Sequence, residues 1–149
     1  MAGALFLVAA GLAACSSRAD IKPSVAAVAG VWTLDPASLP SVAHWTGKSA
    51  KDSKIMLFTD GRLQAVRMPI EDASINPTHA YLSGEGRWEM QREQDHWMLI
   101  FILDHGAYSF YFTDDSAMPS GFYSIVDGPD SGERWVWTKS AAVDAGDKR

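Results

Sequence analysis

The residues that most often carry metal chemistry are few in this chain and follow no metal-binding pattern. The four histidines, none within two or four residues of another, are His44, His79, His96 and His105. Zinc and copper sites usually combine closely spaced His, Cys and carboxylate ligands, and this chain has one cysteine. Asp127, Asp130 and Glu133 do not supply the alternating oxygens of a calcium loop, so a charged turn is expected there. The sequence predicts no metal site and no cofactor.

Candidate catalytic groups are equally sparse. Asp104 and His105 are neighbours, but adjacent side chains on a strand point to opposite faces, so this pair is expected in a turn. Ser83 and Ser120 are each followed by glycine, yet neither lies in a nucleophile elbow of the type G-x-S-x-G. Glycine-rich phosphate-binding loops are also missing from the sequence. We therefore expect a protein that is not an enzyme.

The single cysteine, Cys15, follows an uncharged apolar segment at residues 5–14. This segment is too short to span a bilayer, which takes about 20 residues, but it fits a signal-peptide core of about 7 to 15 residues. The residues LAAC that end at Cys15 resemble the bacterial lipobox. In that family the cysteine receives a diacylglycerol, the preceding peptide is removed, and the new amino terminus is acylated. The resemblance implies a signal peptide at 1–14 and a lipid anchor on Cys15.

The same resemblance implies a location in the bacterial cell envelope. Ser16 and Ser17, in place of an aspartate, resemble the sorting signal of lipoproteins in the Gram-negative outer membrane, facing the periplasm. The departure is the start of the chain, which has no Lys or Arg before Arg18. The alternative is that residues 9–14 form a buried helix and that Cys15 is a small core residue.

Composition restricts the class of partner and the fold. The net charge is −5, and no basic patch is evident, which argues against a nucleic-acid partner. One cysteine excludes an intramolecular disulfide. A domain of about 135 residues buries close to two-thirds of its unfolded surface, so it can fold without one.

Hydrophobic periodicity indicates an all-β domain at residues 29–140, preceded by a tether at 15–28 and followed by a polar tail at 141–149. Strands are expected at 31–35, 55–59, 62–68, 86–91, 96–103, 107–113, 121–126 and 134–139. Asp60-Gly61 predicts a tight hairpin. Loops are expected at 36–51 and at 71–80, and a helical turn at 37–42 is left open.

A meander of about eight antiparallel strands loses both exposed edges when it closes into a barrel, and a β-sandwich is the competing arrangement. Gly30, Val31 and Trp32 resemble the G-x-W signature of lipocalins and other calycins. In that family the indole closes one end of an up-and-down barrel, and an Arg or Lys from near the chain end packs on it. The resemblance leaves two candidates for this cation, Arg134 and Lys139.

A second resemblance covers most of the chain after Cys15. The segments GVWTLD, LFTDGRL, GEGRWEM, WMLIFIL and FYSIVDGPDSGERWVWTK are similar to a group of small secreted or lipid-anchored bacterial proteins with no assigned activity. That group usually has GDPDSG in the last turn, whereas this chain has DGPDSG. The resemblance implies a lipocalin-like fold and brings no activity.

Aromatic residues are concentrated in the expected strands. Besides Trp32, those that could line a ligand site are Trp88, Trp97, Tyr108, Phe110, Phe112, Trp135 and Trp137. Eight strands enclose an interior just wide enough for side chains to fill, so these rings either form the core or line a pocket for an apolar ligand. Trp135 and Trp137 share one strand face, and either face of that strand could be a docking surface.

The sequence therefore predicts a membrane-anchored envelope lipoprotein that acts as a non-catalytic binding module. One hypothesis is a carrier or sensor of a small apolar ligand inside the barrel. The other is a protein-binding role, such as an inhibitor or immunity protein against an envelope toxin or hydrolase.

Overall fold

The structure is a computed structural model that describes residues 21–70, 81–126 and 130–140. The expected signal peptide, Cys15, the loop at 71–80 and the tail at 141–149 lie outside the described residues. These expectations therefore stay predictions.

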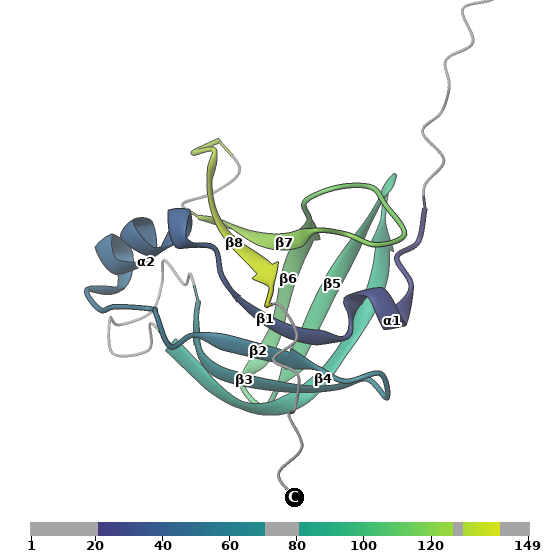
Figure 1. Cartoon of the computed structure of the whole chain (residues 1–149), viewed down its shortest axis with the longest axis horizontal. Helices are drawn as coiled ribbons and strands as arrows, with labels where there is room; N and C mark the ends of the chain where they lie inside the picture. Colours follow the sequence, from purple (N-terminus) through teal and green to yellow (C-terminus); the bar gives the residue numbers. More distant parts are fainter. Residues whose placement is uncertain (1–20, 71–80, 127–129, 141–149) are drawn as a thin grey trace, which may run out of the picture.

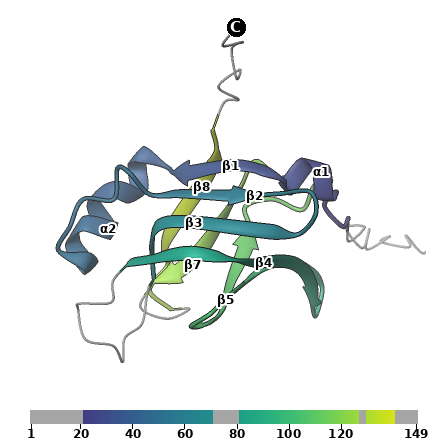
Figure 2. The same cartoon turned by 90° about the horizontal axis from the view of Figure 1, so that it is seen from below.

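Within the described ranges, eight antiparallel strands form one closed barrel in the order of the sequence (Figures 1 and 2). They are β1 (Gly30–Leu34), β2 (Lys54–Leu57), β3 (Arg62–Pro69), β4 (Tyr81–Glu93), β5 (His96–Leu103), β6 (Gly106–Phe112), β7 (Gly121–Val126) and β8 (Glu133–Lys139). The first and last strands pair, with Trp32 opposite Lys139, and this pairing closes the barrel. The predicted all-β barrel is confirmed, and it is consistent with a calycin-like fold.

Local sequence explains most of the strand connections. The Asp60-Gly61 hairpin is confirmed between β2 and β3, with Gly61 at φ 86°, a left-handed conformation that glycine adopts without strain. Asp104 and His105 are exposed in the turn between β5 and β6, as expected. Strand β4 begins at Tyr81, five residues before the expected start, because it also pairs with the end of β3 beyond an irregularity between Ala65 and Met68.

The segment at 36–51, expected as a loop with a helical turn left open at 37–42, contains more helix than expected. A short 3-10 helix, η1 (Pro36–Ser38), leads into α2 (Leu39–Thr46). Asp35 accepts a hydrogen bond from the backbone N–H of Ala37 at 2.8 Å, and Gly47 ends α2 at φ 68°. Val42 and Thr46 are buried, four residues apart on one helical face. Packing against the barrel therefore stabilises a helix whose own sequence favours it weakly.

A second short helix lies before the first strand. Helix α1 (Val25–Val28) lies on the opposite side of the molecule from α2 (Figures 1 and 2). Val28 is completely buried, and its carbonyl accepts a hydrogen bond from Trp32 Nε1 at 2.9 Å. The sequence predicted that the domain starts at residue 29. The packed structure begins earlier, because it already includes Val28.

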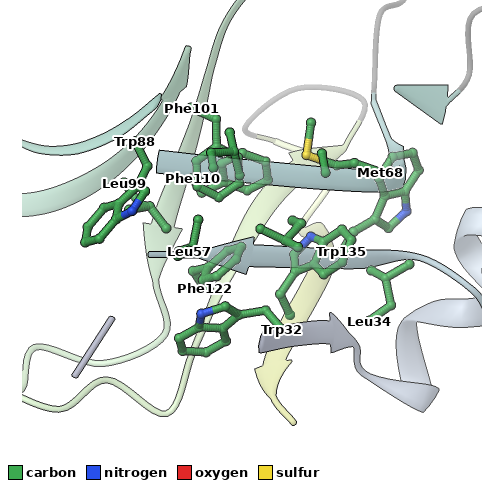
Figure 3. Close-up of a cluster of buried hydrophobic side chains, with 14 of the residues drawn as sticks. Trp32, Leu34, Leu57, Met68, Trp88, Leu99, Phe101, Phe110, Phe122 and Trp135 are labelled. Carbon is green, nitrogen blue, oxygen red and sulfur yellow. The ribbon is translucent and has the colours of Figure 1, made fainter. Parts of the chain in front are cut away.

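Large side chains of the described residues pack together inside the barrel. Figure 3 shows rings from several strands meeting in this core. Phe122 lies 4.9 Å from Trp32, 5.8 Å from Phe101 and 5.4 Å from Phe110, measured between ring centroids. The fully buried residues of the core also include Trp135, Trp137, Ile55, Leu63, Met68 and Leu99. Protein interiors of this kind are packed as densely as organic crystals.

Candidate functional site

The seven aromatic residues that the sequence offered as ligand-lining separate into two groups. Trp88, Phe110, Trp135 and Trp137 are buried in the core, and Tyr108 is partly buried against it. Trp97 and Phe112 line a groove at the rim of the barrel, and Phe112 also packs against the core. The face of β8 that carries its two indoles therefore points inward and is not a docking surface.

The G-x-W residues and Lys139 close one end of the barrel. Lys139 Nζ lies 5.5 Å from the centroid of the Trp32 ring and donates a hydrogen bond to the Ala27 carbonyl at 2.7 Å. Partial burial lowers the pKa of Lys139. Gly30 makes this approach feasible, since a Cβ at this position would lie 2.6 Å from Lys139 Cε. Between the two candidate cations, the geometry selects Lys139.

Arg134, the other candidate, packs elsewhere. Its guanidinium carbon lies 4.3 Å from the centroid of the Tyr123 ring on the outside of the barrel. The Tyr123 ring stacks on Tyr111 at 5.6 Å and 27°, and Tyr111 in turn contacts His96 at 5.5 Å. These side chains form one row across β8, β7, β6 and β5.

A groove of about 270 Å³ lies beside this aromatic row and offers a candidate binding site within the described residues. Its lining consists of five rings and one carboxylate: His96, Trp97, Tyr111, Phe112, Tyr123 and Asp115. Sites for small ligands typically combine apolar and aromatic walls with a few polar groups that set orientation. We call this feature the aromatic groove.

The aromatic groove forms because β5 and β6 separate. Their ladder ends at the pair Met98 and Tyr111, whereas β6 continues to pair with β7 as far as Phe112. Alternate side chains on a strand point to opposite faces, so outward-facing His96 and Tyr111 meet inward-facing Trp97 and Phe112 at the opening. The groove thus reaches from the outer surface toward the rim of the core.

Asp115 is carried by a loop that Asp114 holds in place. Asp114 accepts hydrogen bonds from Ser116 Oγ at 2.5 Å, from Ser120 N at 3.0 Å and from Ser120 Oγ at 2.6 Å. Hydrogen bonds from Ser116 and then from Ser120 lower the pKa of Asp114 to about 2. The loop between β6 and β7 is therefore fixed by an ionised side chain at neutral pH.

Two nitrogen atoms of the lining residues are buried with no hydrogen-bond partner among the described residues. They are Trp97 Nε1 and His96 Nε2. His96 Nδ1 lies 3.3 Å from Asp95 Oδ1, and the hydrogen bond with His96 lowers the pKa of Asp95. The buried polar atoms show that the wall of the groove is less fully satisfied than the core.

Glu133 was one of the three acidic residues compared with a calcium loop in the sequence. In the structure it links β8 to α2 through hydrogen bonds. Its carboxylate accepts hydrogen bonds from Ser41 Oγ and from Trp45 Nε1, the latter at 3.1 Å. The hydrogen bond from Ser41, followed by that from Trp45, lowers the pKa of Glu133. Ser41 also accepts a hydrogen bond from Trp135 Nε1 at 2.9 Å, so Glu133 fastens α2 to β8.

Comparisons with protein-family models, curated proteins and solved structures found no match. Within residues 21–70, 81–126 and 130–140, no three His, Cys, Asp or Glu side chains are grouped as a metal site would require. No helix of these same ranges is long and apolar enough to cross a membrane.

Sequence reasoning missed four of the groove residues: His96, Tyr111, Asp115 and Tyr123. The available signal was the alternation of side chains along a strand. Tyr111 and Tyr123 occupy strand positions that face away from the core, where their rings stay partly exposed. Their meeting with Asp115 could not be foreseen, because it depends on where β5 and β6 separate.

Proposed function

We propose that this protein is a non-catalytic binding module, anchored in the bacterial envelope by a lipid on Cys15, that binds its ligand at the aromatic groove. The observation that carries this proposal is the contrast between the rings packed inside the described part of the barrel and the open groove on its rim. Fully buried rings of Trp32, Phe101 and Phe122 occupy the space where a lipocalin-like carrier would hold an apolar ligand. The groove favours binding at the surface over carriage inside the barrel.

The lipid anchor is supported by the sequence around Cys15. Two or more acyl chains give stable membrane attachment, since each buried methylene contributes about 0.8 kcal/mol. The decisive experiment is intact-mass analysis of the full chain purified from bacterial membranes in detergent. We expect loss of residues 1–14 and a triacylated Cys15, whereas an intact and unmodified amino terminus contradicts the anchor.

The site of binding is tested in the same preparation by native mass spectrometry and by variants. A ligand retained by the wild type and lost on Tyr111→Leu supports the groove. Ile55→Val, which changes the interior without changing the groove, serves as the control. Retention of an apolar ligand by Tyr111→Leu and its loss in Ile55→Val would place binding inside the barrel instead.

A second candidate function is binding to an envelope protein, as an inhibitor or immunity protein. The observation that favours it is an apolar patch on the outer face of β7 and β8, where Tyr123, Ile125 and Val136 are partly exposed. Affinity capture from envelope extracts with the wild type and with Ile125→Glu tests it, and a stoichiometric partner lost only in the variant is the expected result.

A further inference from the structure

The aromatic groove already contacts cationic groups of its own chain at two places. Lys22 Nζ lies 5.0 Å from the centroid of the Trp97 ring, and the Arg134 guanidinium lies 4.3 Å from that of Tyr123. Aromatic faces attract cations through the ring quadrupole, and ammonium ligands are commonly held by several rings together with a carboxylate. Asp115 provides the carboxylate in the lining of the groove.

Charges of both signs therefore surround the groove. The carboxylate of Asp115 lies in its lining, while Lys22 and Arg134 lie over the rings of two lining residues. A ligand with one positive charge would be attracted by Asp115 and repelled by the two cations. A ligand with adjacent positive and negative groups can satisfy both, which favours a zwitterion.

The size of the groove limits the ligand to a small group. Its volume of about 270 Å³ lies just below the range of roughly 300 to 1,000 Å³ that is usual for drug-sized ligands. A phosphate joined to a short ammonium group is of this size class. A folded peptide or a whole acyl chain is not.

The position of the groove relative to the amino terminus points to the source of such a ligand. Lys22 follows Cys15 by seven residues, and an extended chain covers at most about 3.6 Å for each residue, or roughly 25 Å in total. Ser24 N donates a hydrogen bond to Ala117 O at 3.1 Å, so this segment is attached to the loop that carries Asp115. A lipid on Cys15 would keep the groove close to the head groups of the bilayer.

Exposed apolar side chains lie on the same segment and loop. Ile21 and Val25 are exposed at 45% and 43%, and Met118, in the loop between β6 and β7, is exposed at 78%. Figure 1 shows α1 and this loop on the same side of the barrel. Apolar side chains around a cation are typical of surfaces that rest on a membrane interface.

We propose that the aromatic groove binds the head group of a zwitterionic phospholipid in the membrane that anchors the protein. The ammonium group lies against the rings and the Asp115 carboxylate, and the phosphate lies beside the Lys22 ammonium. The inference that the ligand is a membrane phospholipid rests on the proposed lipid anchor. The inference that the groove binds a zwitterion rests only on the residues of the groove.

The test uses the full chain in a nonionic detergent and two soluble probes, phosphocholine and tetramethylammonium. Binding is followed by the NMR signal of the Trp97 indole N–H, assigned with Trp97→Phe. We expect both probes to shift this signal and phosphocholine to bind more tightly. Asp115→Asn should lower the affinity for both probes about 3- to 10-fold, since cation contacts of this kind contribute free energies on this scale.

Lys22→Gln separates the two charges of the ligand. It should lower the affinity for phosphocholine about threefold or more and leave the affinity for tetramethylammonium unchanged, because only phosphocholine carries the phosphate. Asp104→Asn is the matched control, since it removes an exposed carboxylate in the turn at the other end of β5 and should change neither affinity. Unchanged thermal midpoints in the three variants confirm that each remains folded.

Several results would overturn the inference. No shift of the Trp97 signal with either probe excludes a cation site at the groove. Equal affinity for the two probes, or no effect of Lys22→Gln, excludes the phosphate contact and leaves a simple ammonium group, such as a lysine of a partner protein. The probes bind without a membrane. An unmodified Cys15 together with specific phosphocholine binding would therefore contradict the proposed lipid anchor and still support the binding chemistry of the groove.

Discussion

Replacing Asp114 with asparagine should destabilise the loop that carries the groove carboxylate. The side chain accepts hydrogen bonds from Ser116 and Ser120, and these hold its pKa at about 2, compared with an ordinary value of 3.8. At about 1.4 kcal/mol for each pKa unit, this difference corresponds to an upper limit of about 2.5 kcal/mol of stability. Asp114 is partly exposed, so solvent screening reduces the expected contribution to about 1 kcal/mol.

The pH dependence of this contribution has a definite sign. The pKa of Asp114 is lower in the folded state, so the unfolded state binds more protons between pH 4 and pH 2. Its stabilisation is fully present above about pH 4 and disappears as the pH falls toward 2. Urea unfolding of the wild type and of Asp114→Asn, measured at pH 6 and at pH 2.5, should therefore differ by about 1 kcal/mol at the higher pH and by much less at the lower pH.

The control for this experiment is the next residue. Asp115→Asn removes the same charge from the same loop without touching the hydrogen bonds of Asp114, so stability should change by less than about 0.5 kcal/mol. If Asp114→Asn loses the same stability at pH 6 and at pH 2.5, ionisation of this side chain is not what fixes the loop. Equal losses in the two variants would show that net charge alone is responsible.

Three further predictions concern the barrel and its helix. Gly30→Ala should cost about 1 to 3 kcal/mol in urea unfolding, because φ is 141° and the new methyl group would collide with Lys139; a smaller loss would mean that the lysine moves aside freely. Phe122→Ala should cost about 3 to 5 kcal/mol by leaving a cavity in the core, whereas exposed Phe58→Ala should cost little; similar losses in both would refute a packed interior. Glu133→Gln should remove an acid-sensitive change in the fluorescence of Trp45, whose indole donates a hydrogen bond to Glu133. The pKa of Glu133 is lowered in the folded state, so its stabilising effect is lost as the pH falls through the acidic range. The same acid profile in the wild type and the variant would contradict this.

Strand positions could be read from the sequence because alternating hydrophobicity has a period of two. The segment around Phe101 and Phe110 follows this rule, and the structure places both rings in the core. Barrel closure was also predictable in outline, since a meander with free edges is a liability. The choice between Arg134 and Lys139 was not, because it depends on the register that sets Trp32 opposite Lys139.

Helix α2 was missed for a different reason. Asp35 caps the 3-10 helix η1 that leads into α2, and Gly47 ends α2, so both ends of this helical region carry standard signals. The segment between them has only two buried side chains, Val42 and Thr46, so no clear apolar stripe was visible. Tertiary contacts, including the hydrogen bonds of Ser41 and Trp45 with Glu133, supply what local periodicity lacks.

The pairing of β1 with β8 has a consequence for how the chain reaches its native state. All other strand pairs join neighbours in the sequence and can form while synthesis is still in progress. The pairing of β1 with β8 sets Trp32 opposite Lys139, which lies 107 positions later in the chain. Ser140 N also donates a hydrogen bond to the Val31 carbonyl. Until the final strand is synthesised, the sheet has two unpaired edges that can associate with other chains.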